Sequence, residues 1–183
     1  SALLAGYIGA SDTRGARSAW DGGMVVDNPW MAYFSDFHQF RRLNRFNLVD
    51  IYALGGSGPG AFSPLQLSIA EEARAWARRA LEGASDWIAV QAGASDSMKA
   101  WHPHLFGLTL ARLSKQWPGG IVFIGITEEE AVIAEVTQVY KKAGGQNSVK
   151  NMAGRTTVSQ LAGLLAECRV LLTNDTGPMH VSV

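Results

Sequence analysis

The sequence predicts an α/β fold in which residues from about 84 to 183 form an open, Rossmann-like parallel sheet. The main observation is an alternation of short apolar runs with longer helical patterns, in the order strand, helix, strand, helix, strand, helix, strand. The composition agrees, because 47% hydrophobic and 17% charged residues in a chain of 183 residues suit a packed core. Small or polar loops follow the apolar runs, at the edge where such sheets bind ligands.

The first half of this pattern runs from residue 69 to residue 117. Apolar side chains recur on one face over residues 69–81, which predicts a helix with charged residues outside. Ser68 is expected to cap this helix, with Glu71 completing a capping box. The apolar run at 87–93 predicts a buried strand that ends in glycine. Residues 103–117 predict the next helix, which a Pro-Gly-Gly sequence ends.

The second half completes the predicted sheet. A strand at 121–125 precedes a helix at 128–145, whose early acidic residues and late lysines complement the helix dipole. Gly144 is its expected C-cap. The remaining elements are a short strand at 148–154, a helix at 158–167 and a strand at 169–173. Four loops then share one edge of the sheet, at residues 93–99, 125–129, 154–157 and 174–180.

The N-terminal third has a different character, and the predicted domain boundary divides residues 1–64 from residues 65–183. Residues 28–56 predict a helix followed by a loop, and the glycine-rich residues 55–64 predict a linker. The chain opens without methionine, and only five residues follow the helix start at Pro178. We therefore expect a fragment of a longer protein, truncated within its last helix.

A basic run at residues 38–46 contains Arg41, Arg42 and Arg45. Such a run is most often a solvated helix face. The alternative is a basic surface for an anionic lipid or a sugar phosphate.

Charge, hydropathy and cysteine content argue against several classes of protein. Lys and Arg (16) balance Asp and Glu (16), so no global field favours nucleic acid. No apolar run approaches the ~20 residues of a membrane span, and no signal peptide opens the chain. The single cysteine, Cys168, cannot form an internal disulfide, which fits a cytoplasmic protein. We expect Cys168 to pack as a small buried side chain.

The loop at residues 173–180, with the sequence TNDTGPMH, is the most distinctive stretch of the chain. Thr176 can cap the helix that Pro178 begins, and Gly177 lets a ligand approach the backbone. This favours an anion such as a phosphate, although an ordinary strand–turn–helix junction uses the same residue types. The tripeptide DTG also occurs in aspartic proteases, but those enzymes are all-β, so we reject that reading for an α/β context.

Two further loops at the same edge support an anion site. Residues 91–103 hold Lys99, which can meet a phosphate as a point charge or stand as a solvated surface lysine. His102 and His104 flank Pro103 and lack a clear third ligand, so we expect no metal. Residues 125–130 place carboxylates at a helix start, where they complement the dipole or accept hydrogen bonds from ribose hydroxyls.

Taken in order, these loops resemble glycosyltransferase family 9, the ADP-heptose:lipopolysaccharide heptosyltransferases. The matching patterns are GAS with a following Lys, Trp and Pro, then G-x-x-x-E, N-x-x-G-x-T and NDTGPMH. The match covers residues 84–183 well. Residues 1–64 more loosely resemble the close of that family's N-terminal domain, with a helix near the NLVD sequence at 47–50.

The resemblance implies the C-terminal half of a GT-B type enzyme, with roles for the residues that match the family's motifs. Ser95 and Lys99 would contact the diphosphate or the sugar, and Glu129 would hold the ribose. Thr156 and its neighbours would line the base. The family's Lys-Xaa-Trp-Pro pattern departs here, since one extra residue precedes Pro103.

The last motif implies four further donor contacts. Asp175 would face the sugar hydroxyls, Thr176 and Gly177 would lie on the phosphates, and His180 matches the family's histidine. Lys99 and Asp175 are thus the catalytic residues that the resemblance implies for this chain. The family's general base lies near the start of the N-terminal domain, outside this chain, so we expect the isolated chain to bind donor with little turnover.

The implied reaction is inverting sugar transfer from a nucleotide-diphosphate donor, expected to be ADP-heptose, to a lipopolysaccharide-core or related glycan acceptor. No cofactor and no metal are expected, and the location is cytoplasmic with possible peripheral contact at the inner membrane. Two other hypotheses remain open at this point. One is a non-catalytic nucleotide-binding module, and the other is a UDP-sugar epimerase of related fold.

Overall fold

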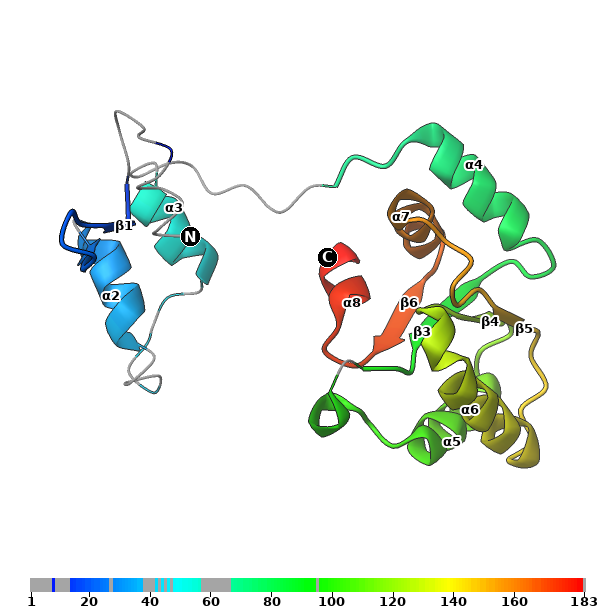
Figure 1. Cartoon of the computed structure of the whole chain (residues 1–183). Helices are drawn as coiled ribbons and strands as arrows, with labels where there is room; N and C mark the ends of the chain where they lie inside the picture. The colour runs from blue at the N-terminus through cyan, green and yellow to red at the C-terminus, as the bar shows by residue number, and fades with distance from the viewer. Residues whose placement is uncertain are drawn as a thin grey trace. The chain divides into compact units, whose positions relative to one another are not determined.

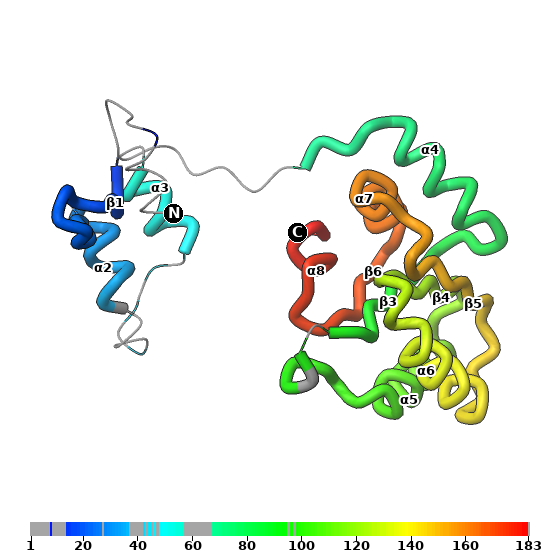
Figure 2. The backbone as a smooth tube through the Cα atoms, viewed as in Figure 1, coloured from blue at the N-terminus to red at the C-terminus, as the bar shows by residue number. Residues whose placement is uncertain are grey.

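A computed structural model describes residues 8, 14–26, 28–37, 42, 44, 46, 48–56, 67–94 and 96–182. The chain divides into two compact units, Ser1–Pro64 and Leu65–Val183. Figures 1 and 2 trace both units from blue at the N-terminus to red at the C-terminus. The role of the first unit as the tail of an N-terminal domain stays a prediction.

The described residues of the first unit include a hairpin and two helices. Strands β1 (Ala16–Ser18) and β2 (Met24–Val26) pair antiparallel, and helices α2 (Pro29–Phe37) and α3 (Leu48–Gly56) pack on each other. Asn28 joins the two helices, because its Oδ1 accepts from Trp30 N at 2.8 Å and its Nδ2 donates to Gly55 O at 3.0 Å.

Two expectations for this unit need correction. The hairpin was not predicted, and α3 lies where the pattern predicted a loop, although the family resemblance implied a helix near residues 47–50. The helix is stabilised by long-range packing, since Ile51 is fully buried. Most of the expected linker at 55–64 lies outside the described residues. So do Arg41 and Arg45 of the basic run, whereas Arg42 is exposed.

The second unit is built on a four-stranded parallel sheet. Its strands are β3 (Trp87–Gln91), β4 (Gly120–Phe123), β5 (Val149–Asn151) and β6 (Val170–Thr173). Their spatial order is β5-β4-β3-β6, so the chain reverses direction across the sheet between β3 and β6. Open α/β sheets bind ligands at this topological switch point, outside the carboxyl ends of the strands.

Helices cover both faces of this sheet (Figure 1). Helices α5 (Pro103–Ser114) and α6 (Glu130–Lys142) pack together on one face, and α4 (Glu71–Ala80) and α7 (Val158–Ala166) pack together on the other. Short helices η2 (Ser97–Lys99), η3 (Thr127–Glu129) and α8 (Gly177–Val181) follow β3, β4 and β6.

Two apolar cores result from the alternation of side chains along β3 and β4. Ile88 and Phe123 belong to the core under α5 and α6, and Ala89 and Val122 to the core under α4 and α7. Cys168 is half-buried against the second core, and burial raises the pKa of its thiol to about 12. This agrees with its expected packing role, because such a thiol stays protonated and inert at neutral pH.

All the helices and strands predicted for this unit are present, and several are shorter than predicted. One predicted helix cap, Ser68, is wrong. Helix α4 begins at Glu71 with Ala70 at the N-cap and no side-chain cap among the described residues, so Ser68 does not cap it. Gly144 does end α6, since it has a φ of +88° and Gly145 N donates to Tyr140 O at 3.0 Å in a Schellman-type turn. No helix within the described ranges is long and apolar enough to cross a membrane.

Close packing of α4 on α7 leads to a first prediction, on stability. A Cβ at Gly163 would lie 2.6 Å from Ala73 O. Because this is a backbone atom, relieving the overlap would require the two helices to shift. Helix propensity alone favours alanine over glycine. We nevertheless expect Gly163→Ala to lower the free energy of unfolding by about 1–3 kcal/mol, because overpacking dominates.

Urea denaturation of the 183-residue chain measures this effect. Ser159→Ala, at an exposed position of the same helix, is the control and should unfold like the wild type. Unchanged or increased stability of Gly163→Ala would show that the helices are less closely packed than the structure indicates.

Candidate functional site

A cavity of about 640 Å³ opens at the carboxyl edge of the sheet. The loops after all four strands contribute to its wall. The wall is mostly apolar, with Trp101, Ile126, Val158 and Leu161 among its side chains, and a few polar groups project into it. A largely apolar cleft with few convergent polar groups is the usual form of a small-molecule site.

Glu129 is the most firmly held polar group in this cavity. Gln91 Nε2 donates to both carboxylate oxygens, to Oε1 at 3.0 Å and Oε2 at 2.8 Å. Ile126 N donates to Oε2 at 3.0 Å. Glycines leave room for the carboxylate on both sides, because a Cβ at Gly93 would overlap Oε1 and a Cβ at Gly125 would overlap Oε2. The cavity therefore contains a carboxylate with a fixed orientation at the carboxyl edge of the sheet.

Asn174 joins the two loops on either side of the switch point. Its Nδ2 donates to Ala92 O at 2.9 Å and to Gly93 O at 3.0 Å, and its Oδ1 accepts from Trp101 N at 3.0 Å. Asn174 is buried, and all of these bonds are long-range in the sequence. The loop that carries Lys99 is thus held against the loop that carries Asp175.

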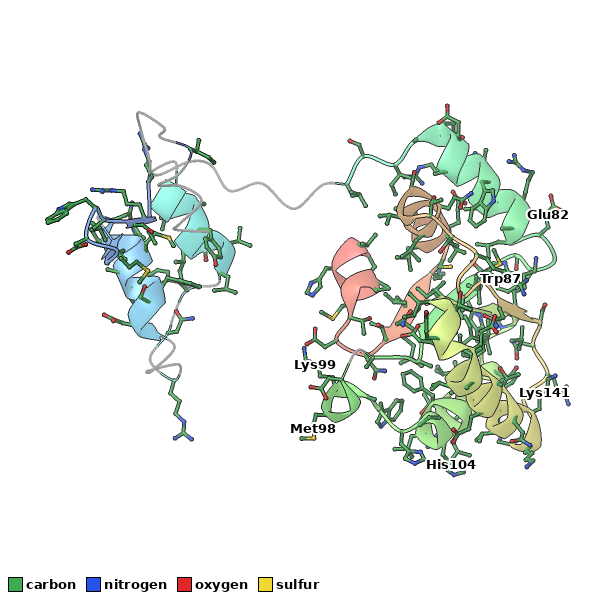
Figure 3. All side chains as sticks on the ribbon, in the orientation of Figure 1. Glu82, Trp87, Met98, Lys99, His104 and Lys141 are labelled. Carbon is green, nitrogen blue, oxygen red and sulfur yellow. The ribbon has the colours of Figure 1, made fainter. Side chains whose placement is uncertain are left out.

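A charged cluster lies beside the cavity. Lys99 Nζ lies 3.3 Å from Asp175 Oδ2, and His180 Nε2 lies 4.0 Å from Asp175 Oδ1. All three side chains are more than half exposed, so the pairs are screened by water and add little stability. Figure 3 shows Lys99 on the turn beside the start of the C-terminal segment. Lys99 thus presents an exposed ammonium group next to the cavity.

The structure places seven of the eight expected donor-binding residues, in two groups. Glu129, Thr156, Thr176 and Gly177 line the cavity, whereas Lys99, Asp175 and His180 form the adjacent cluster. Ser95 lies outside the described residues.

One expected local role is wrong in detail. Thr176 occupies the N-cap position of α8, but its hydroxyl makes no capping bond among the described residues. Its Oγ1 lies 3.2 Å from Thr173 Oγ1 instead. The same hydroxyl donates to Asn174 O at 3.4 Å, so it points back toward the end of β6 and not into the first turn of the helix. At Gly177, no described atom beyond its chain neighbours and its own helix backbone lies within 4 Å of where a Cβ would stand, so the position is open to solvent.

The histidines of the loop after β3 have a structural explanation. His102 is the N-cap of α5, and its Nδ1 accepts from His104 N at 3.2 Å. The residue that departs from the family pattern before Pro103 thus starts the helix. Within the described ranges, no three His, Cys, Asp or Glu side chains are grouped so as to hold a metal ion.

Sequence reasoning missed the residues that orient the site. Both residues stand in loops that the sequence singled out, but their roles depend on partners 38 residues away for Gln91 and 73 to 82 residues away for Asn174. One signal for Gln91 was present, since it is the only polar residue of the otherwise apolar strand WIAVQ.

Comparison with known proteins identifies the family. The family model described as glycosyltransferase family 9 (heptosyltransferase) matches residues 53–183. The chain belongs to glycosyltransferase family 9. The α/β class is confirmed with it, as a parallel-sheet domain of the GT-B type found in this family.

Individual family 9 relatives match parts of the chain. Lipooligosaccharide heptosyltransferase 2 of Campylobacter jejuni is 34% identical over 97 residues, which are 52% of this chain and 29% of that protein. The Haemophilus ducreyi protein of the same name is 31% identical over 84 residues, 46% of this chain and 24% of that one. The chain thus spans less than a third of the length of these curated relatives.

Solved family 9 structures share the fold. The ADP-heptose LPS heptosyltransferase II of E. coli has a TM-score of 0.55 and 25% identity, covering 68% of this chain and 38% of that one. The glycosyl transferase family 9 protein of Veillonella parvula has a TM-score of 0.58 and 22% identity, covering 79% and 45%. At 22% identity, the similarity to the Veillonella parvula protein supports only the shared fold.

Proposed function

We propose that residues 65–183 bind the nucleoside diphosphate part of a nucleotide-sugar donor, expected to be ADP-heptose. The observation that carries this proposal is the fixed carboxylate of Glu129 in the cavity, with Lys99 and Asp175 beside it. Glu129 would accept from the ribose hydroxyls, the apolar wall near Thr156 would receive the base, and Lys99 would meet the diphosphate.

The parent protein would then be an inverting glycosyltransferase of heptosyltransferase type. An acceptor hydroxyl oxygen bonds to the anomeric carbon while the bond from that carbon to the diphosphate oxygen breaks. The electron pair leaves on the diphosphate, where Lys99 and backbone N–H groups at Thr176 and Gly177 would stabilise the developing charge. Asp175 would hold the sugar hydroxyls. The hydroxyl proton passes to a general base that the family places in the N-terminal domain.

The acceptor and the location follow from similarity alone. The named relatives act in lipooligosaccharide or lipopolysaccharide assembly by their names. The proposal therefore includes a lipopolysaccharide-core or related glycan acceptor and a cytoplasmic site of action with peripheral contact at the inner membrane.

Calorimetric titration of the 183-residue chain with ADP, GDP and UDP tests the donor proposal. ADP should bind most tightly. A preference for UDP would favour a UDP-sugar epimerase-like enzyme instead. Binding of no nucleotide would contradict the proposed function. A transfer assay should show little turnover by this chain, and robust turnover would overturn the proposal that the general base is not among residues 1–183.

A second titration isolates the role of Lys99. Because Lys99 would contact only the diphosphate, we expect Lys99→Ala to weaken ADP binding about tenfold, or about 1.4 kcal/mol. Adenosine, which has no phosphate, should bind both proteins equally. Lys141→Ala, an exposed lysine at the end of α6, is the matched control and should leave both affinities unchanged (Figure 3). Equal loss of ADP and adenosine binding would contradict this role.

A further inference from the structure

We propose that Gln91 is a positioning residue that fixes Glu129 so that one carboxylate oxygen, Oε1, is presented to the ligand. This inference rests on the proposed function, since the ligand group in question is the ribose of a nucleotide. Gln91 is the last residue of β3 and is only 3% exposed. It is one of the residues that line the cavity, and it would act on the ligand through Glu129.

The orientation of the Gln91 amide follows from its partner. Its Nε2 lies within hydrogen-bond distance of both oxygens of Glu129. An ionised carboxylate only accepts hydrogen bonds, so the amide must turn its NH₂ group toward it. The consequence is that Gln91 Oε1 is buried with no hydrogen-bond partner in the part of the chain that the structure describes.

The two oxygens of Glu129 are not equivalent in this arrangement. Oε2 receives two donors, Gln91 Nε2 and Ile126 N, which fill its two acceptor positions. Oε1 receives only Gln91 Nε2 among the described residues. One acceptor position on Oε1 therefore stays open for a hydroxyl of the ligand.

The carboxylate cannot easily turn away from this orientation. It lies close against the backbones of Gly93 and Gly125, where a Cβ would overlap one of its oxygens, and the bonds from Gln91 Nε2 and Ile126 N fix its orientation. The Gln91 amide holds it from below. Such pre-organisation reduces the entropy lost on binding and so favours affinity and selectivity.

The buried, unpartnered oxygen of Gln91 indicates that the residue is retained for the site. Buried polar atoms without partners are rare in folded proteins, and each one asks for an explanation. The rest of β3 is apolar, so packing alone would be satisfied by another apolar side chain at position 91. Local departures from the best packing are typical of functional sites.

Gln91→Met tests the proposal, because methionine keeps the length of the side chain and removes the amide. The probes are ADP and 2′,3′-dideoxy-ADP, which lacks both ribose hydroxyls, titrated into the 183-residue chain by calorimetry. The wild type should bind ADP at least about tenfold more tightly than the dideoxy form, as expected for a hydrogen bond to a charged group. Gln91→Met should reduce that ratio several-fold by weakening ADP binding alone.

The double mutant with Glu129→Gln separates positioning from a general structural effect. If Gln91 acts through Glu129, then Gln91→Met should add no further loss in the Glu129→Gln background. Gln91→Leu provides a second variant without the amide, and a thermal melt of each protein verifies folding. Neither Gln91→Met nor Gln91→Leu should show the wild-type ratio of ADP affinity to dideoxy-ADP affinity.

The possible failures differ in what they overturn. Equal weakening of ADP and dideoxy-ADP by Gln91→Met, or an unchanged ratio, would overturn the positioning role while the proposed function stands. A wild-type chain that binds no ADP would overturn the proposed function and this inference with it.

Discussion

Replacing Gly93 with alanine is expected to weaken ADP binding by at least about tenfold while leaving the fold intact. A Cβ at this position would overlap Oε1, Cδ and Cγ of Glu129. The backbone of Gly93 does not have a positive φ, so alanine is tolerated by the main chain itself. The Glu129 side chain must therefore move, and it then loses its bonds to Gln91 and Ile126.

The free energy of unfolding is expected to fall by about 1–3 kcal/mol, because the displaced carboxylate leaves Gln91 Nε2 and Ile126 N without their present partner. Calorimetry with ADP and urea denaturation on the same protein measure the two effects. Gly56→Ala is the matched control, since no described atom beyond its chain neighbours and its own helix backbone lies within 4 Å of its Cβ position, and it belongs to the first unit. Wild-type ADP affinity in Gly93→Ala would contradict the role of the fixed carboxylate.

Replacing Asn174 with alanine is expected to lower both stability and affinity. The change leaves Ala92 O, Gly93 O and Trp101 N without their present side-chain partner in a buried region. We expect the free energy of unfolding to fall by about 2–4 kcal/mol, because unmade buried hydrogen bonds are expensive. ADP binding should weaken as well, since the loop with Lys99 is no longer held against Asp175.

Asn174→Asp sharpens this prediction. Aspartate keeps an acceptor for Trp101 N but turns a negative oxygen toward the carbonyls of Ala92 and Gly93, so it should be at least as destabilising as alanine. Gln138→Ala, an exposed amide on α6, is the control and should change stability by less than about 0.5 kcal/mol. Near-wild-type stability of both Asn174 variants would contradict the bridging role.

The sheet and its helices could be predicted because their signal is local. Apolar runs such as residues 87–91 and 120–123 are buried on both sides, and the helices between them show one apolar face. The hairpin at β1 and β2 was missed because each of its strands has only three residues. Helix α3 was missed by pattern reading because its burial depends on packing against α2.

The sequence predicts which loops meet at the candidate site, but not which side chains in them bond to one another. A parallel sheet brings loops at its carboxyl edge together, so Glu129, Thr156 and Gly177 could be expected near one another. The roles of Gln91 and Asn174 depend on contacts across the switch point, between segments far apart in sequence. The missing cap at Ser68 shows the same limit, since the N-cap position depends on where α4 meets the rest of the unit.

A crystal structure of the 183-residue chain with ADP is the most direct test of the account. The account predicts ADP in the 640 Å³ cavity, with a ribose hydroxyl within hydrogen-bond distance of Glu129 Oε1 and the diphosphate within reach of Lys99 Nζ. ADP bound elsewhere, for example in the groove between α6 and β5 lined by Lys141 and Asn151, would contradict it.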